Sequence, residues 1–323
     1  MPKISIIIPI YGVEKFIEQC ARSLFAQTMN ELEFIFIDDC TPDNSIAIIE
    51  KVLTRFPHRI SQTRIVSMAE NSGIAAVRRY GISIATGEYI MFCDSDDWVD
   101  IHICNELYNK AVIQDSDAVF CDFFKSTDAD QIYVKRELNN IQDILSLQKY
   151  IIKNQFWTVW ATIIKRSIYL QNEIIYPSYN NAEDAVLICQ LLFYIKSFAY
   201  VDKGLYFYRY NPKSISRKMD ISSIEFRVNE QKGNIVLLEQ FYKKQNCIKR
   251  GIYKNILVAL KLNCISHYFS ISNNMIYVNK ARRLFTNLDY KTIVLNPYIS
   301  SRLKFLFIIW DCGLYTKIKA IFK

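Results

Sequence analysis

Short apolar runs alternate with helix-like segments along the first part of the chain. The runs are rich in β-branched residues and lie at 3–10, 32–39, 63–69, 88–94 and 117–124. Between them, apolar residues recur at helical spacing over 14–26, 43–56, 73–85 and 100–114. Strands that alternate with helices at such short spacing predict parallel βαβ units in a doubly wound α/β sheet.

The remainder of the chain becomes progressively helical. A helix-like segment at 141–153 is followed by the apolar run 156–164, a second helix at 183–196 and the strand-like 205–210. Long helical patterns then cover 222–242, 250–270 and 275–287. The shift in composition near 215–220 predicts a first domain of residues 1–217 and a mostly helical, basic region of residues 218–323.

Composition and charge narrow the class of protein. Apolar residues make up 51% and charged residues 22% of the chain, which is typical of a folded protein. Residues 201–323 hold 22 Lys and Arg against 7 Asp and Glu, a net charge of +15. This excess indicates an anionic partner such as a lipid surface or a nucleic acid, with a merely solvated basic face as the alternative.

The nine cysteines form no C-x-x-C pair and no metal-binding spacing. They indicate a reducing compartment, and Cys93 and Cys121 fit small buried hydrophobes. The start MPKISIII lacks the pattern of a signal peptide, and no apolar run approaches the roughly 20 residues that span a bilayer. We therefore expect a cytoplasmic protein, one that rests at most peripherally on the inner face of the cytoplasmic membrane.

Polar residues gather at the ends of the predicted strands. Pro9 and Tyr11 end the first strand, Asp39 the second, and Asn71 follows the third. The fourth strand ends in Asp94-Ser95-Asp96. Ligands of such sheets bind beyond the carboxyl ends of the strands, so these clusters should share one rim.

The acids at 94–97 have two possible interpretations, a solvent-exposed turn or a cation site. If the backbone is extended, the carboxylates of Asp94 and Asp96 point to the same side. Hard oxygen ligands suit Mg²⁺ or Mn²⁺, which complete their coordination with phosphate oxygens and water. Taken alone, the cluster is explained better by an Asp-rich turn, because such turns are common after strands. Glycine-rich phosphate loops are absent and the three histidines are isolated, which disfavours a dehydrogenase, a P-loop NTPase and a histidine-based triad.

Several motifs occur in a characteristic order over roughly residues 3–216. They are ISIIIPIYGVEKFIEQCARSLFAQT, FIFIDDCTPDNS, ENSGIAAVRRYGISIATGEYIMFCDSDDWV and NNAEDAVLICQLLFYI. Together they resemble the motifs of family 2 glycosyltransferases, which have the GT-A fold, a Rossmann-like and mostly parallel sheet flanked by helices. Gly12 and Arg79 stand where the family commonly has Asn.

The resemblance implies roles for individual residues. Contacts to the nucleotide-sugar donor would come from Pro9, Tyr11, Asp39, Asn71, Arg78, Asp94 and Ser95. Asp94 and Asp96 would hold the metal, Mn²⁺ or Mg²⁺, and Asp184 would be the catalytic base. Further acceptor or donor contacts would come from Glu183, Trp157, Trp160 and Arg209. Each assignment has a structural alternative. Glu183 and Asp184 could simply stabilise the start of a helix through its dipole, the two Trp residues could belong to an aromatic core, and Arg209 could pack within its strand.

The function implied by the resemblance is an inverting transfer of a hexosyl or N-acetylhexosaminyl group. The donor is a UDP-sugar and the acceptor a saccharide hydroxyl, carried on a lipid, in the assembly of a bacterial capsule or O-antigen. Residues 301–323, basic and apolar, fit an interfacial helix on an anionic membrane or a helix packed on the catalytic domain. The alternatives are a sugar-phosphate nucleotidyltransferase and a non-catalytic nucleic-acid-binding protein. No nucleic-acid partner is expected, because the acidic rim would repel phosphate unless a metal ion intervened.

Overall fold

The computed structural model describes residues 1–127, 130–210, 220–245, 251–270, 279–280, 283–285, 288 and 290–311. Its strands are β1 (Ile4–Ile10), β2 (Leu32–Asp38), β3 (Thr63–Ser67), β4 (Tyr89–Phe92), β5 (Trp98–Val99), β6 (Ala118–Ser126), β7 (Gln131–Val134), β8 (Thr162–Lys165) and β9 (Phe198–Arg209). Its α-helices are α1 (Ile17–Phe25), α2 (Ser45–Leu53), α3 (Ile74–Ile84), α4 (Ile103–Gln114), α5 (Ile144–Asn154), α6 (Arg166–Leu170), α7 (Glu183–Tyr194), α8 (Ile221–Lys244), α9 (Gly251–Ser266), α11 (Tyr290–Val294) and α12 (Ser301–Asp311). Short 3-10 helices are η1 (Pro57–Gln62), η2 (Leu138–Asn140) and η4 (His267–Ser270).

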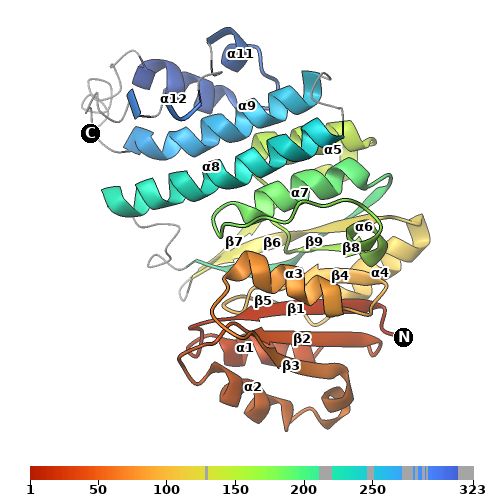
Figure 1. Ribbon diagram of the computed structural model, residues 1–323. Helices are drawn as coiled ribbons and strands as arrows, with labels where there is room; N and C mark the ends of the chain where they lie inside the picture. Colours follow the sequence, from red (N-terminus) through yellow and green to blue (C-terminus); the bar gives the residue numbers. More distant parts are fainter. Residues whose placement is uncertain are drawn as a thin grey trace. The chain divides into compact units, whose positions relative to one another are not determined.

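The strands in the described ranges form one sheet in the order β3-β2-β1-β4-β8-β6-β9-β5, with β7 paired to β6 (Figure 1). β1 pairs in parallel with β2 and β4, and β2 pairs in parallel with β3. Beyond β4 the sheet is mixed, because β8 runs antiparallel to both β4 and β6. The α/β GT-A fold with a C-terminal helical region is confirmed, and its parallel part is the one that the strand–helix alternation predicts.

Helices cover both faces of the parallel strands. In β2, Phe34 and Phe36 point to one face, where Phe25 of α1 packs against them at ring distances of 5.5 and 5.7 Å. Alternation along the strand sends Ile37 to the other face. There Gly81 of α3 approaches so closely that an added Cβ would lie 2.9 Å from the side chain of Ile37. Coverage on both faces explains why these strands are apolar runs without polar alternation.

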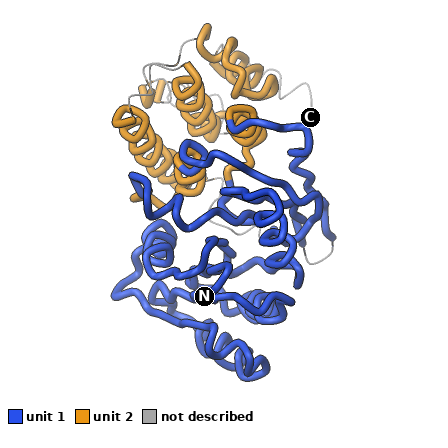
Figure 2. The backbone as a smooth tube through the Cα atoms, turned by 90° about the vertical axis from the view of Figure 1, so that its right-hand side faces the viewer, with its two compact units in different colours: residues 1–144, 158–176, 191–211 blue, residues 145–157, 177–190, 212–323 orange. Residues whose placement is uncertain are grey.

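The chain folds into two compact units (Figure 2). The first comprises residues 1–144, 158–176 and 191–211, and the second comprises 145–157, 177–190 and 212–323. The second unit therefore includes two segments from the middle of the chain, which the shift in composition near 215–220 does not mark. The division into a domain of residues 1–217 and a region of residues 218–323 stays a prediction.

The second unit is helical and has its own core. The rings of Tyr242 in α8 and Tyr253 in α9 lie 4.7 Å apart, and Trp310 of α12 packs at 4.7 Å against Phe269 of η4. Of the segment 301–323, the described part is α12, which buries this ring and leaves Phe305 58% exposed. Residues 312–323, and most of the predicted helix at 275–287, lie outside the described residues.

The structure also bears on the cysteines and on the length of the helices. Cys93 and Cys121 are completely buried, as predicted. Within the described ranges, every helix is too short or too polar to cross a membrane.

Candidate active site

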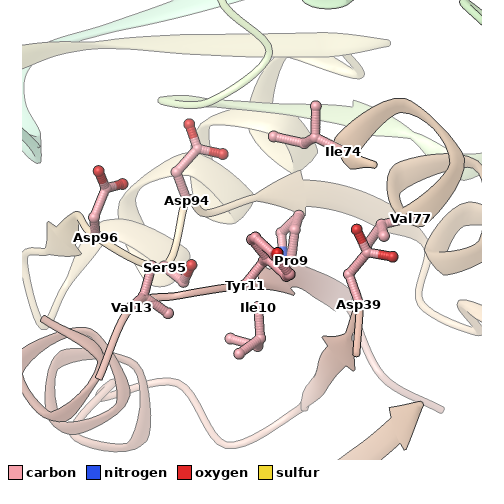
Figure 3. A pocket seen from close by; sticks show the side chains of 10 residues that line it. All are labelled: Pro9, Ile10, Tyr11, Val13, Asp39, Ile74, Val77, Asp94, Ser95 and Asp96. Atoms are coloured by element: carbon pink, nitrogen blue, oxygen red, sulfur yellow. The ribbon is translucent and has the colours of Figure 1, made fainter. Parts of the chain in front are cut away.

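A cavity of about 230 Å³ opens at the carboxyl ends of β1, β2 and β4 (Figure 3). Figure 3 shows Pro9 and Tyr11, at the end of β1, between Asp39 on one side and Asp94 and Asp96 on the other. The complete lining is Pro9, Ile10, Tyr11, Val13, Asp39, Ile74, Val77, Asp94, Ser95 and Asp96. Six of the residues singled out from the sequence thus share one cavity on the rim where the sheet topology places them.

The carboxylate of Asp39 is fixed by the start of α3. Its two oxygens accept hydrogen bonds from the backbone N–H groups of Ser72, at 2.7 Å, and Gly73, at 2.9 Å. Gly73 has φ of 80°, a conformation that favours glycine and lets both amides face the carboxylate. Asp39 is only 4% exposed, so these bonds offset the cost of burying its charge. Asn71 precedes this pair and is exposed, outside the cavity lining.

Arg78 supplies a nearly buried positive charge beside the acids. Its Nη2 donates to Oδ1 of Asp94 at 2.8 Å, and its guanidinium carbon lies 5.6 Å from the centre of the Phe92 ring. The Arg78 side chain is 4% exposed and that of Asp94 is 23% exposed. The pair therefore fixes the orientation of Asp94 and partly balances the charge of the acid cluster.

Asp97 anchors the turn that carries the other two acids. It is 1% exposed, and its oxygens accept hydrogen bonds from the Tyr206 hydroxyl and the Arg209 backbone N–H, both at 2.7 Å. The Tyr206 oxygen in turn accepts the N–H of Asp94 at 3.1 Å. Strand β9 thus determines the shape of the turn through Asp97, which turns away from the cavity lined by its neighbours.

The electrostatics of the turn favour a cation. Burial, and secondarily the charge of Asp94, raise the pKa of Asp96 to about 6. Burial, together with Asp96 and Asp94, raises the pKa of Asp97 well above its usual value. Among the described residues no group of three or more His, Cys, Asp or Glu side chains could hold a metal ion. The two carboxylates of Asp94 and Asp96 nevertheless fit Mg²⁺ or Mn²⁺, since these ions take one or two carboxylates and complete their shell with phosphate oxygens and water.

Arg209 and Trp160 lie in the aromatic packing around β9. The Arg209 guanidinium lies against the rings of Phe16 and Trp98, at 4.9 and 4.7 Å, and its Nε donates to the Asp96 carbonyl at 2.8 Å. Trp160 is 6% exposed and stacks on Tyr206 at 4.7 Å. Both residues support the turn and the sheet, and neither lines the cavity.

Asp184 lies in the second unit, in the first turn of α7. It is half-buried, and its Oδ1 accepts the N–H of Ala185 at 2.8 Å, while the neighbouring Glu183 is 7% exposed. Asp184 and Trp157 line a second cavity, of about 300 Å³, whose walls belong to the second unit. Six of the sequence-predicted residues therefore line the first cavity and two line the second. The linings of these two cavities do not include Asn71, Arg78, Trp160, Glu183 and Arg209.

Helix α8 positions the loop that leads to Asp184. The sequence patterns did not reveal this role of the helix. Asn234 is completely buried, and its side chain donates to the carbonyls of Tyr179 and Asn181 at 2.9 and 2.8 Å and accepts the Tyr179 N–H at 3.3 Å. A Cβ on Gly233 would overlap the Tyr179 ring. The dipeptide Gly-Asn within a long helical pattern is the one available signal, because both residues are poor helix formers.

Comparisons with known proteins identify the family and the fold. The profile of glycosyl transferase family 2 matches residues 5–186. The uncharacterized glycosyltransferase EpsJ of Bacillus subtilis is 32% identical over 67% of this chain, a match that spans 63% of EpsJ, less than two thirds of its length.

Solved structures show the same fold. S. aureus TarS, residues 1–349 in complex with UDP-GlcNAc, has a TM-score of 0.70 and 17% identity over 97% of this chain and 90% of that one. The mannosyltransferase PcManGT of Pyrobaculum calidifontis, in complex with GDP-Man and Mn²⁺, has a TM-score of 0.55 and 13% identity over 99% of this chain and 87% of its own. The match of the family profile covers more than half of the chain. The protein belongs to glycosyl transferase family 2.

Proposed function

We propose that the protein transfers a sugar from a UDP-sugar to a saccharide hydroxyl, with inversion at the anomeric carbon and with Mn²⁺ or Mg²⁺ as cofactor. One observation carries the proposal: in a member of this family, Asp39, Asp94 and Asp96 open onto a single cavity at the ends of β1, β2 and β4. The similarity in fold to TarS bound to UDP-GlcNAc supports uracil as the base.

On the donor side, Asp39 accepts the uracil imide N–H. A carboxylate suits this role because it only accepts hydrogen bonds, and its orientation is already fixed by Ser72 and Gly73. Pro9 and Tyr11 line the same cavity and contact the nucleoside. Asp94, oriented by Arg78, contacts the ribose or the metal, and Asn71 and Ser95 complete the donor contacts.

Asp94 and Asp96 would hold the metal. When bound there, a divalent ion would supply positive charge to balance the negative charge that develops on the departing diphosphate. The raised pKa of Asp96 supports this assignment, since a nearby cation favours the charged carboxylate that burial disfavours. Arg78 adds a positive charge beside Asp94, one of the two residues that would hold the metal.

On the acceptor side, Asp184 acts as the general base. It takes the proton of the acceptor hydroxyl while that oxygen forms a bond to the anomeric carbon. The bond between the anomeric carbon and the diphosphate breaks in the same step, and UDP leaves with the electron pair. A single displacement of this kind turns an α-linked donor into a β-glycoside.

We place the reaction in the assembly of a bacterial surface polysaccharide, on a lipid-linked acceptor at the inner face of the cytoplasmic membrane. Membership of the family supports this role, as does the net charge of +15 on residues 201–323, which would attract an anionic membrane. On α12, Arg302 and Phe305 are exposed and available for such a contact.

Thermal unfolding with nucleotides tests the donor and the metal. UDP, GDP and dTDP are each added with MnCl₂ or with EDTA. UDP with MnCl₂ should raise the melting temperature, EDTA should remove most of the effect, and Asp96→Asn should lose the dependence on MnCl₂. Asp130→Asn changes an exposed acid directly before β7 and serves as the matched control. A larger rise in melting temperature with GDP than with UDP would indicate a GDP-sugar as the donor. The absence of any nucleotide effect would contradict the proposal.

A further inference from the structure

The cavity beside Asp184 has walls from several helices of the second unit. It measures about 300 Å³, within the range of small-molecule sites, although at its lower end. Residues 155 and 157 follow α5, residues 181–186 belong to the start of α7 and the loop before it, and the remaining walls come from α8, α9 and η4. The side chains that matter for its chemistry are those of Trp157, Asp184, Arg227, Gln231, Asn263 and His267.

The polar lining is suited to hydroxyl groups. Gln231 and Asn263 carry amides, which both donate and accept hydrogen bonds, as hydroxyls do. Burial and the nearby Arg227 guanidinium lower the pKa of His267 to about 4, so its ring is neutral at neutral pH. A ring nitrogen of His267 lies 3.1 Å from the amide nitrogen of Gln231, which links the two side chains.

The charge and the apolar surface restrict the ligand further. Arg227 and Asp184 contribute one charge of each sign, so the lining has no excess that would select an anion or a cation. Trp157, Ile235 and Leu260 add aromatic and aliphatic surface. An apolar wall combined with side chains that donate and accept matches a sugar ring, which has C–H faces and a rim of hydroxyls.

We infer that this cavity is the acceptor site, which binds the neutral sugar ring whose hydroxyl is deprotonated by Asp184. The inference rests on the proposed function. If Asp184 is the base, the acceptor hydroxyl must lie next to it, and the residues around Asp184 then contact the acceptor. Gln231 and Asn263 then determine acceptor specificity, while the proposed nucleotide contacts all come from the first unit. Changes at these two residues should weaken acceptor binding and leave nucleotide binding unchanged.

Saturation-transfer NMR with small sugars tests the inference. The probes are methyl β-glucoside, methyl β-galactoside and methyl N-acetyl-β-glucosaminide, each titrated into the full chain. Wild type should bind at least one of them, and Gln231→Ala or Asn263→Ala should raise its Kd about three- to tenfold, the effect of losing one hydrogen bond. The control is Gln240→Ala, the same exchange at an exposed position of α8, which should bind like wild type.

UDP-induced thermal shifts, recorded on the same samples, separate the two ideas. Normal UDP shifts in both cavity variants, with weakened sugar binding, support the inference. Sugar binding that is absent in wild type, or equal in wild type and both cavity variants, would overturn the acceptor site and leave the donor site unaffected. Loss of the UDP response in wild type would instead count against the proposed function itself.

Discussion

Nη2 of Arg78 donates a hydrogen bond of 2.8 Å to Oδ1 of Asp94, and the two residues come from the second turn of α3 and the end of β4. The Arg78 side chain is 4% exposed, so the pair lies largely out of water. Breaking such a pair from one side leaves a charge without compensation. The neighbouring Asp96 and Asp97 increase that cost here, because both are acids in the same turn.

Arg78→Ala should therefore destabilise the protein by about 3 kcal/mol, as observed when one partner of a buried ion pair is removed. MnCl₂ should recover part of the loss, because the ion would balance Asp94 and Asp96. Denaturant unfolding with and without MnCl₂ measures both effects. Arg22→Ala, which removes an exposed i,i+4 pair with Glu18, is the control and should cost well under 1 kcal/mol. Equal stability of the two variants would contradict the role given to Arg78.

The turn after β4 should depend on Asp97 for its shape. Asp97→Ala removes the acceptor of the Tyr206 hydroxyl and of the Arg209 N–H, both in a buried environment, and should cost about 2–4 kcal/mol. Asp97→Asn should cost less, because its amide oxygen still accepts the Arg209 N–H. Urea unfolding gives the free energies, and a larger loss in the Asn variant than in the Ala variant would refute this account.

Asn234 should affect turnover through the loop that it holds. Asn234→Ala removes three hydrogen bonds to Tyr179 and Asn181, so the start of α7 should lose its fixed position. We expect kcat to fall at least about tenfold, while the UDP-induced thermal shift stays at the wild-type value. The control is Asn229→Ala at an exposed position of α8. A parallel loss of the UDP response would mean that the residue acts on the whole fold instead.

His267 should make a destabilising contribution in mild acid, opposite in sign to the contributions of Asp96 and Asp97, whose raised pKa values favour protonation of the folded chain. The pKa of His267 is lowered from 6.5 to about 4, so the unfolded chain takes up this proton first as the pH falls. The contribution of the neutral ring is fully present above pH 6.5 and is lost as the pH falls toward 4, amounting to about 3 kcal/mol. His267→Gln should remove this contribution from the pH profile of unfolding and leave the variant more stable relative to wild type near pH 4 than near pH 7, whereas exposed His58→Gln should keep the wild-type profile. Identical profiles for the wild type and His267→Gln would exclude His267 as the cause.

The parts of the fold that could be predicted are those with a local signature. Buried parallel strands such as β1 and β2 are continuous apolar runs, and the rule for strand ends places Asp39 and Asp94 on one rim from topology alone. The antiparallel β8 and the two-residue β5 lack such a signature, because their pairing depends on partners far along the chain. The hydrogen bond from the Asn234 side chain to the Tyr179 carbonyl joins residues 55 positions apart. Helical periodicity gives no indication of such a contact.

The proposed mechanism rests on Asp184 as the base, and one variant tests it directly. Asp184→Asn keeps the shape of the side chain and removes its ability to take a proton. Transfer from the UDP-sugar to the best-binding methyl glycoside is measured by UDP release, and UDP affinity is measured on the same sample by calorimetry. We predict wild-type UDP affinity and a kcat reduced about 10²- to 10⁴-fold. A kcat within about threefold of wild type, with UDP bound normally, would contradict the account.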